Sequence, residues 1–290
     1  MKKIIILIPV YNDWESLKKL LIEIEESIKD FNNLIIECLV VNDASTINVP
    51  ELKKPKIINS LKILNMKENR GHARCNAFGI RHAIQNEKFD LLILMDGDGE
   101  DRPIELGSLI RESLKEPVNS VVAKRIKRSE GLIFRFLYFM HKNITLFFTG
   151  KKINFGNYSC LTKKDASTIN AIPSLWSSYS GTIKKNLNNL REVDSIRGER
   201  YFGPSKMSLF KLIIHSFSII AVFKYQVFLR SILIILLLIW LNTYLGDVSL
   251  ILIFLVIAFN FIILIVSFRE KKKDLLDSHN NLKNIKEITH

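Results

Sequence analysis

Residues 91–103 read Leu-Leu-Ile-Leu-Met-Asp-Gly-Asp-Gly-Glu-Asp-Arg-Pro. The apolar run Leu91–Met95 predicts a strand buried on both faces, as in a parallel sheet. Asp96, Asp98 and Glu100 then leave the end of that strand in a glycine-spaced turn. Crowded carboxylates repel one another, so a cation would stabilise them, and hard oxygen ligands suit Mg²⁺ or Mn²⁺. A solvated acidic turn is the alternative, because Asp and Gly are common turn residues.

Strand and helix patterns alternate on both sides of this stretch. We expect strands at Ile4–Ile8, Leu34–Val41, Ile57–Leu64, Phe89–Met95 and Val118–Ala123, and helices at Trp14–Ile28, from Asn69-Arg70-Gly71 to Ile84, and from Pro103 to Leu114. This alternation predicts an α/β fold with a doubly wound, mostly parallel sheet. Polar groups at 11–13, 42–46 and 96–101 each follow a predicted strand. Because such sheets bind ligands at the carboxyl ends of their strands, these groups predict one site.

The composition of the chain indicates which classes of ligand or partner it could bind. The chain has 290 residues, enough for one large or two small domains, and a formal net charge of +13. A basic chain suggests nucleic acid, anionic lipid or phosphorylated substrates. Cys38, Cys75 and Cys160 are widely separated, which argues against a disulfide framework or zinc site and fits reduced thiols. The apolar run Ile4–Val10 is short and lacks a small-residue cleavage site, so we expect a first strand rather than a signal peptide.

Two long apolar stretches follow in the last quarter of the chain. Residues 227–245 and 248–268 are each about long enough to cross a bilayer at roughly 1.5 Å per residue. Arg230, near the start of the first, can snorkel to the interface. Basic residues follow the second stretch, at Arg269 and 271–273, and the turn between the stretches has none. The positive-inside rule thus predicts a transmembrane hairpin with both ends and the N-terminal domain in the cytoplasm. A buried hairpin of a soluble protein is the alternative.

Two further segments have an amphipathic character. Residues 131–149 are rich in aromatic residues with interspersed basic ones and predict a helix lying in a membrane interface, or alternatively a buried core helix. Residues 206–225 form a second, juxtamembrane candidate. Weaker strand patterns occur at Asn154–Leu161 and Leu190–Ile196, and we expect the polar tail 270–290 to be mobile from Asp274 onward. We thus divide the chain into an α/β domain (1–205), the juxtamembrane helix (206–225), the hairpin (226–269) and the tail (270–290).

An ordered set of short motifs resembles glycosyltransferase family 2, which has the GT-A fold. Within that family the chain is most similar to the polyprenyl-phosphate sugar synthases, such as dolichyl-phosphate mannose synthase. The matching pieces are Ile8-Pro9-Val10-Tyr11-Asn12-Asp13, Val41-Asn42-Asp43-Ala44-Ser45-Thr46, Asn69-Arg70-Gly71-His72, the stretch 96–103, Arg125, and Arg200-Tyr201-Phe202-Gly203-Pro204-Ser205-Lys206. Each is weak alone, and their order gives the resemblance its specificity.

The resemblance implies roles for the acidic and nucleotide-facing residues. Pro9, Tyr11 and Asp13 would border the nucleobase, with Asp13 where the family commonly has Glu. Asp43 would accept a hydrogen bond from the base, for which a carboxylate is well suited; a helix cap or turn residue is the alternative. Asp96 and Asp98 correspond to the family's metal-binding Asp-x-Asp, with Asp96 on the ion or the ribose.

Further positions match the family's third ligand and phosphate contacts. Glu100 stands where relatives often have a Gln metal ligand. Arg125, Arg200, Ser205 and Lys206 match positions that hold the diphosphate or the lipid phosphate, and Arg135 is a further candidate, since guanidinium groups suit phosphate oxygens. For each basic residue the alternative is a surface charge or a contact to anionic lipid. His72 is expected to be structural.

The acceptor can be argued from chemistry. A sugar hydroxyl needs a general base, whereas a phosphate monoester is already ionised near neutral pH. Between Thr149 and Arg200 the acids are Asp165, Glu192, Asp194 and Glu199, and none forms the Glu-Asp pair typical of relatives that glycosylate hydroxyls. The Gln-x-x-Arg-Trp of processive synthases is also missing from the sequence. A lipid-phosphate acceptor is therefore favoured, with a single displacement and inversion at the anomeric carbon.

Three hypotheses follow. The first is an integral membrane glycosyltransferase that moves a hexose from a UDP- or GDP-linked sugar to polyprenyl phosphate, with Mg²⁺ or Mn²⁺ as cofactor. The second is a related enzyme that glycosylates a hydroxyl of a surface polysaccharide or glycolipid. The third is a membrane-anchored scaffold without activity, against which the acidic cluster argues. The expected partners are the nucleotide-sugar, the lipid and the membrane, with no nucleic acid; a homo-oligomer stays open.

Overall fold

An eight-stranded sheet carries the fold in the computed structural model, which describes residues 1–127, 132–204 and 208–289. Its strand order is β7-β5-β6-β4-β1-β2-β3-β8. The strands are β1 (Lys2–Val10), β2 (Leu34–Asn42), β3 (Ser60–Met66), β4 (Leu91–Leu94), β5 (Val121–Lys127), β6 (Phe155–Thr162), β7 (Arg191–Ile196) and β8 (Leu282–Ile288). All seven strands expected from the sequence are therefore present, with boundaries shifted by a few residues.

Strand β1 lies at the centre of the sheet and determines where a ligand can bind. It pairs in parallel with β2 on one side and with β4 on the other, and β2 pairs in parallel with β3. Strands β5 and β7 are also parallel, whereas β6 and β8 run antiparallel to their neighbours. The mostly parallel α/β sheet is thus confirmed. The strand order reverses between β1 and β4, and such a switch point leaves a crevice at the carboxyl ends of the two strands.

Helices cover both faces of the sheet, which explains why its central strands are continuously apolar. Ile4, Ile6 and Ile8 face the core under α1, and the alternate residues Ile5 and Leu7 face the core under α2. The helices of this part are α1 (Trp14–Ile28), α2 (His72–Asn86), α3 (Leu106–Lys115), α5 (Lys163–Ile169) and α6 (Tyr179–Asn186), with 3-10 turns η1 (Pro103–Glu105) and η2 (Pro173–Trp176). The expected helix Trp14–Ile28 has the observed bounds.

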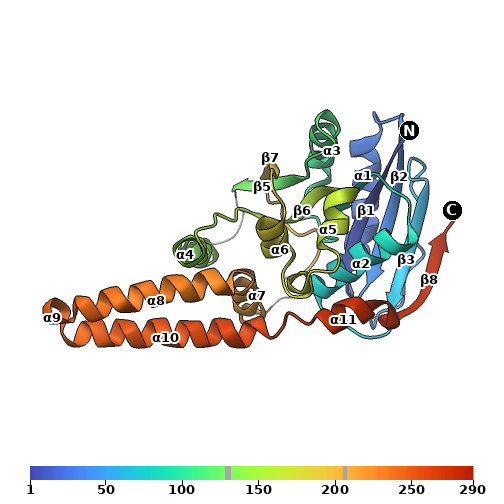
Figure 1. Cartoon of the computed structure of the whole chain (residues 1–290). Coiled ribbons are helices and arrows are strands. Elements are labelled where there is room, and N and C mark those ends of the chain that lie inside the picture. Colours follow the sequence, from blue (N-terminus) through green and yellow to red (C-terminus); the bar gives the residue numbers. More distant parts are fainter. Residues whose placement is uncertain (128–131, 205–207, 290) are drawn as a thin grey trace.

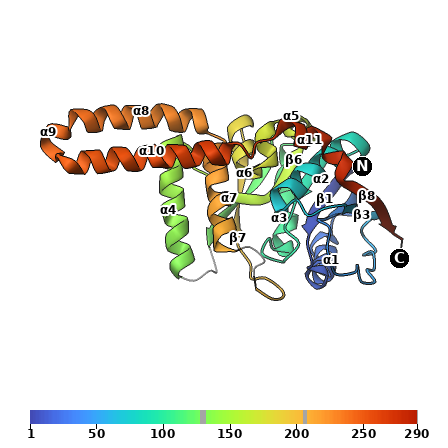
Figure 2. The same ribbon diagram turned by 90° about the horizontal axis from the view of Figure 1, so that it is seen from below.

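The apolar part of the chain forms a projecting group of helices (Figures 1 and 2). It consists of α4 (Leu132–Thr149), α7 (Leu209–Ala221), α8 (Lys224–Trp240), α9 (Asn242–Leu245) and α10 (Asp247–Ser267). Helices α8 and α10 lie side by side as a hairpin closed by α9, and α4 and α7 lie across its base. An ion pair of 2.7 Å between Lys224 Nζ and Glu270 Oε2 closes the base. Arg230, expected to snorkel, donates to the carbonyl of Phe147 (2.7 Å) and so caps the end of α4.

Length and composition distinguish the two arms of this hairpin. Among the described residues, α10 alone is long and apolar enough to cross a membrane. Helices α7 and α8 meet the same test only as a pair, and they are bent by 84° at the break between them. The sequence predicts two membrane-spanning helices. By length and composition, α10 meets this prediction by itself, and α8 meets it only together with α7.

The C-terminal tail corrects a sequence expectation. Residues from Asp274 onward were expected to be mobile, yet they form α11 (Lys272–Leu276), the turn η3 (Asp277–Asn281) and β8. Leu275 is fully buried, and Arg81 Nη2 donates to the carbonyl of Leu276 (3.2 Å). Strand β8 pairs with the edge strand β3, as Figure 1 shows. Backbone pairing at a sheet edge does not require apolar side chains, so the polar tail carried no signal of it.

Candidate functional site

Three distant segments meet at the crevice between β1 and β4. Arg200 Nη1 donates to Asp98 Oδ2 at 2.6 Å, and its Nη2 pairs with Asp13. The other oxygen of Asp13 accepts from the hydroxyl of Ser16 at 2.6 Å, which fixes the carboxylate at the start of α1. One guanidinium therefore bridges the loop after β1 and the acidic turn after β4. The structure thus brings together three of the residues predicted from the sequence.

The acidic turn owes its shape to glycine and to its own backbone. Asp98 Oδ1 accepts from the N–H of Glu100 (3.1 Å), and Asp101 Oδ2 accepts from the N–H of Asp96 (3.0 Å). Gly99 has φ +88°, a left-handed conformation that suits glycine. A Cβ there would lie 2.6 Å from the ring of Tyr201, so glycine also permits this close contact.

A second segment docks on this turn through its backbone. The N–H of Gly198 donates to the carbonyl of Glu100 (2.8 Å), and the N–H of Tyr201 donates to the carbonyl of Asp98 (2.9 Å). Arg197, which sequence reasoning did not select, forms an ion pair with Glu100. No local pattern distinguishes Arg197 from other surface arginines, and only the docking reveals it.

Asp96 has two polar partners that the sequence did not suggest. His72 Nε2 lies 3.2 Å from Asp96 Oδ1, and Asn157 Nδ2 donates to the same oxygen at 3.2 Å. Asn157 also contacts the His72 ring (2.7 Å). His72 stands at the first position of α2. The histidine expected to be structural therefore contacts one of the two aspartates expected to bind the metal.

Burial and neighbouring charges set the protonation of the acidic turn. Burial alone would raise the pKa of Asp96, but the nearby His72 and Arg125 outweigh it, and the pKa is lowered. The pKa of Asp98 is raised by burial and by the charge of Asp96. The same two causes raise the pKa of Asp101 to about 7. Asp96 is thus the most firmly ionised carboxylate of the turn, as a ligand for a cation must be.

Arg125 reaches the acidic turn from β5. Its Nη2 lies 3.8 Å from Asp101 Oδ1. Gly156 on β6 makes room, because a Cβ there would overlap the Arg125 guanidinium. Ser205 and Lys206 lie outside the described residues, as does the side chain of Arg135. Their phosphate-binding roles stay predictions.

The nucleobase side is built around Asp43. Its two carboxylate oxygens accept from the N–H groups of Arg70 (2.7 Å) and Gly71 (2.8 Å), and the residue is 3% exposed. Asp43 therefore anchors the turn before α2 from the end of β2, which is a structural role other than the helix cap or turn residue considered from the sequence. Its contact with a base stays a prediction. Pro9 is buried at the end of β1, whereas Tyr11 is exposed.

The carboxylates suit a divalent ion with two protein ligands. Among the described residues, no three His, Cys, Asp or Glu side chains are grouped so that they could hold a metal ion. Glu100, the expected third ligand, is paired with Arg197. Mg²⁺ commonly takes one or two carboxylates and completes its shell with substrate phosphates and water. Asp96 and Asp98 supply such a pair of hard donors, both partly buried.

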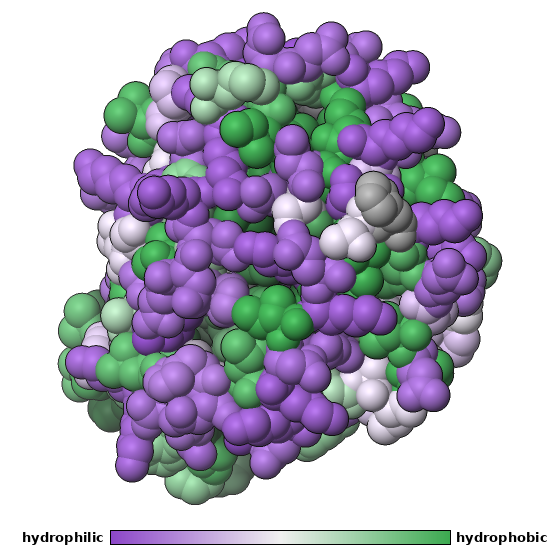
Figure 3. Space-filling view, turned by 90° about the vertical axis from the view of Figure 1, so that its right-hand side faces the viewer, coloured by the Kyte–Doolittle hydropathy of each residue, from purple (hydrophilic) through white to green (hydrophobic). Residues whose placement is uncertain are grey.

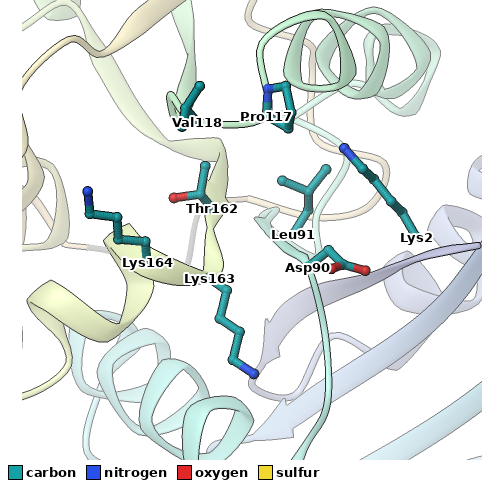
Figure 4. A pocket seen from close by; sticks show the side chains of 8 residues that line it. All are labelled: Lys2, Asp90, Leu91, Pro117, Val118, Thr162, Lys163 and Lys164. Atoms are coloured by element: carbon teal, nitrogen blue, oxygen red, sulfur yellow. The ribbon is translucent and has the colours of Figure 1, made fainter.

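A separate hollow lies at the opposite, amino end of β1 and β4. It has a volume of about 220 Å³ and is lined in part by Lys2, Asp90, Lys163 and Lys164 (Figure 4). One Asp90 oxygen already accepts from the backbone N–H of Lys3 (2.8 Å). None of the residues predicted for the site lines this hollow, so we place no chemistry there.

Comparison with curated sequences identifies the family. The model of the family described as Glycosyl transferase family 2 matches residues 5–169. An undecaprenyl-phosphate 4-deoxy-4-formamido-L-arabinose transferase of Yersinia enterocolitica is 28% identical over 227 residues, which cover 73% of this chain and 65% of that protein. An uncharacterized protein of Methanocaldococcus jannaschii is 30% identical over 112 residues, covering 37% of this chain and 45% of that protein. The chain therefore spans less than two thirds of these relatives.

Solved structures agree on the fold. Mannosyl-3-phosphoglycerate synthase from Rubrobacter xylanophilus superposes with a TM-score of 0.54 at 14% identity, covering 76% of this chain and 72% of that one. Glucosyl-3-phosphoglycerate synthase from Mycobacterium tuberculosis was solved with Mn²⁺, UDP-glucose and phosphoglyceric acid. It superposes with a TM-score of 0.51 at 14% identity, covering 78% of this chain and 80% of that one. Both therefore share the α/β fold with its mostly parallel sheet. From its motifs, its site and the matched family model, the chain belongs to glycosyltransferase family 2.

Proposed function

We propose that this glycosyltransferase moves a hexose from a nucleotide-sugar to polyprenyl phosphate at a membrane surface, with inversion at the anomeric carbon. The main observation in support is that two arginines of the site stand shortly before apolar helices in the chain. Arg125 on β5 precedes α4, and Arg200 precedes α7, each by fewer than ten residues. Candidate phosphate ligands and lipid-facing helices are thus neighbours in the chain, as an acceptor with a phosphate head and an isoprenoid tail requires.

At the nucleotide-sugar, the acidic residues would bind the metal ion and the basic residues would bind the phosphates. Asp96 and Asp98 would hold Mg²⁺ or Mn²⁺, which neutralises charge on the diphosphate leaving group. Arg200 and Arg125 lie within reach of the same turn and would bind phosphate oxygens in place of their present carboxylate partners. A phosphate acceptor brings its own ionised oxygen, so no protein base is needed to activate it.

The apolar hairpin would anchor the enzyme in the bilayer. Along α8 and α10 most large apolar side chains are exposed, including Leu233 (58%), Trp240 (68%) and Phe254 (69%). Exposing a continuous apolar surface of this kind to water is costly, and lipid would cover it. Since basic residues follow α10 and the α9 turn has none, the catalytic part and both ends of the chain would face the cytoplasm.

The acceptor is supported by two independent observations. The Yersinia relative is named for transfer involving undecaprenyl phosphate. In this chain the segment between Thr149 and Arg200 lacks the paired acids that would serve a hydroxyl acceptor. A hydroxyl of a polysaccharide or glycolipid is the competing acceptor, and it would yield a product of different chemistry.

The test is a transfer assay on membranes that contain the full-length protein. Radiolabelled UDP- and GDP-sugars are supplied with polyprenyl phosphate, with and without EDTA, and the products are extracted into organic solvent. We expect a lipid-soluble product that mild acid cleaves, because a sugar phosphodiester is acid-labile, and we expect EDTA to abolish it. Asp98→Asn should lose at least a hundredfold in rate yet remain in membranes, whereas the exposed Asp30→Asn should not change the rate. An acid-stable product, or full activity of Asp98→Asn, would refute the proposal.

A further inference from the structure

A polar hollow at the β2–β3–β8 edge is used by nothing described so far. Its volume is about 400 Å³, within the range of about 300–1,000 Å³ typical of small-molecule sites. Its lining joins the carboxyl ends of β2 and β3 to the C-terminal strand through Asn42, Ser45, Asn65, Lys67, Lys283 and Asn284. The side of the molecule that carries β3 and β8 is mainly hydrophilic (Figure 3). A ligand here would be polar.

Three asparagines form a chain of amide hydrogen bonds along one wall. Asn42 Nδ2 donates to Asn65 Oδ1 at 2.8 Å, and Asn65 Nδ2 donates to Asn284 Oδ1 at 2.8 Å. The backbone N–H of Ser45 donates to Asn42 Oδ1 (3.0 Å) and so fixes which way the first amide points. The direction of the first amide sets that of the next, because each bond needs one donor and one acceptor. The exposed end of the chain is therefore the NH₂ group of Asn284, a donor.

The C-terminal segment is held firmly at this position. The N–H of Lys67 donates to the carbonyl of Asn281 (2.7 Å), and the ammonium of Lys67 donates to the carbonyl of Asn280 (2.8 Å). Asn281 also exchanges side-chain hydrogen bonds with the backbone of Glu68 (3.1 and 3.2 Å). The wall formed by β8 is thus part of the fold and is pre-organised for binding.

The hollow adjoins the part of the site expected to bind the nucleobase. Its residues Asn42 and Ala44 flank Asp43 in the chain. The loop after β2 is bound to the loop after β1, because Asn12 N donates to Ser45 Oγ (2.9 Å) and Asn12 Oδ1 accepts from Thr46 N (2.8 Å). A nucleotide lying over Tyr11 would therefore find this hollow beside its base.

We infer that the C-terminal strand completes a nucleobase pocket, in which Asn284 donates a hydrogen bond to the base of the donor nucleoside diphosphate. The inference rests on the proposed use of a nucleotide-sugar. Amides match base edges, since both present donors and acceptors in one plane. Asn284 is then a specificity-determining residue that lies more than two hundred residues after the β2 and β3 parts of the pocket in the chain.

The test uses a substitution that keeps the amide chain and changes its outward end. In Asn284→Asp the carboxylate still accepts from Asn65 but offers an acceptor where the wild type offers a donor. Lys286→Gln is the control, because it lowers the net charge by the same amount at a position on β8 that does not line the hollow. The full-length protein in detergent is titrated with UDP, GDP, CDP, ADP and dTDP in the presence of Mn²⁺, and thermal unfolding confirms that each variant is folded.

We expect Asn284→Asp and Asn284→Ala to weaken binding of the preferred nucleotide about three- to tenfold, the loss of one hydrogen bond, and Lys286→Gln to bind as the wild type does. Unchanged affinity in both Asn284 variants, or a wild type that binds no nucleotide, would overturn the inference. Lipid transfer measured on the same proteins separates the two proposals. If no lipid product forms but the Asn284 variants bind nucleotide more weakly, the acceptor proposal fails and the pocket stands.

Discussion

The contact between Gly99 and Tyr201 predicts an unequal response of two glycines to alanine. Both Gly99 (φ +88°) and Gly203 (φ +63°) have left-handed backbones, which cost an alanine about 1–2 kcal/mol. At Gly203 nothing lies within 4 Å of an added Cβ, whereas at Gly99 the Tyr201 ring lies 2.6 Å away. That overlap adds about 1–3 kcal/mol, the usual range for overpacking.

The pair of variants therefore separates strain from crowding. We expect Gly203→Ala to lower the free energy of unfolding by about 1 kcal/mol, since alanine also restricts the unfolded chain, and Gly99→Ala to lower it by about 2–4 kcal/mol. Gly99→Ala should also slow transfer tenfold or more, because a displaced Tyr201 moves Arg200 away from Asp98. Gly203→Ala supplies the matched control for backbone strain.

The measurements are urea unfolding of the detergent-solubilised protein and the initial rate of transfer. A third variant tests the cause: in a Tyr201→Ala background, Gly99→Ala should cost no more than Gly203→Ala does, because the crowding partner is gone. Equal destabilisation by the two alanines in the wild-type background, or an unchanged gap after Tyr201 is removed, would show that the ring does not confine the turn.

Three further predictions follow from buried groups and the sheet edge. Asp43→Ala removes the acceptor of two partly buried hydrogen bonds, so it should destabilise by about 1–3 kcal/mol in urea unfolding. A change under about 0.5 kcal/mol would refute the anchoring role. Burial raises the pKa of Cys38 and Cys160 to about 12, so only a small fraction of either thiol is thiolate at pH 8. Iodoacetamide should therefore label both cysteines on the order of a thousandfold more slowly in the native protein than in the urea-unfolded protein. Comparable labelling rates would contradict their burial. Deletion of residues 282–290 uncovers the edge of β3 and should cause aggregation in size-exclusion chromatography, whereas a mobile tail could be removed without effect.

Several features of the molecule could be predicted from the sequence because their signals are local. The run Leu91–Met95 is apolar without alternation, and a strand buried on both faces is its consequence in the structure. The spacing of Leu17, Leu20 and Ile24 predicts the buried face of α1. The acidic turn could likewise be placed at the carboxyl edge, since alternating strands and helices leave little choice of topology.

Other features depend on contacts between distant segments. The pairing of Arg197 with Glu100 and the approach of His72 to Asp96 join residues whose local sequences resemble ordinary surface positions. The hydrogen bonds from Arg70 and Gly71 to Asp43 likewise join two distant segments, so the sequence did not reveal the role of Asp43 in holding the turn before α2.

The sequence by itself therefore determined the fold class, the family resemblance and the edge of the sheet that bears the site. Tertiary structure decided which charges are paired, where the C-terminal strand lies, and which residues line the hollow beside Asn284. The physical reason is that hydrophobic periodicity is a property of neighbouring residues. Hydrogen bonds and ion pairs depend on positions that only the folded chain brings within about 3–4 Å.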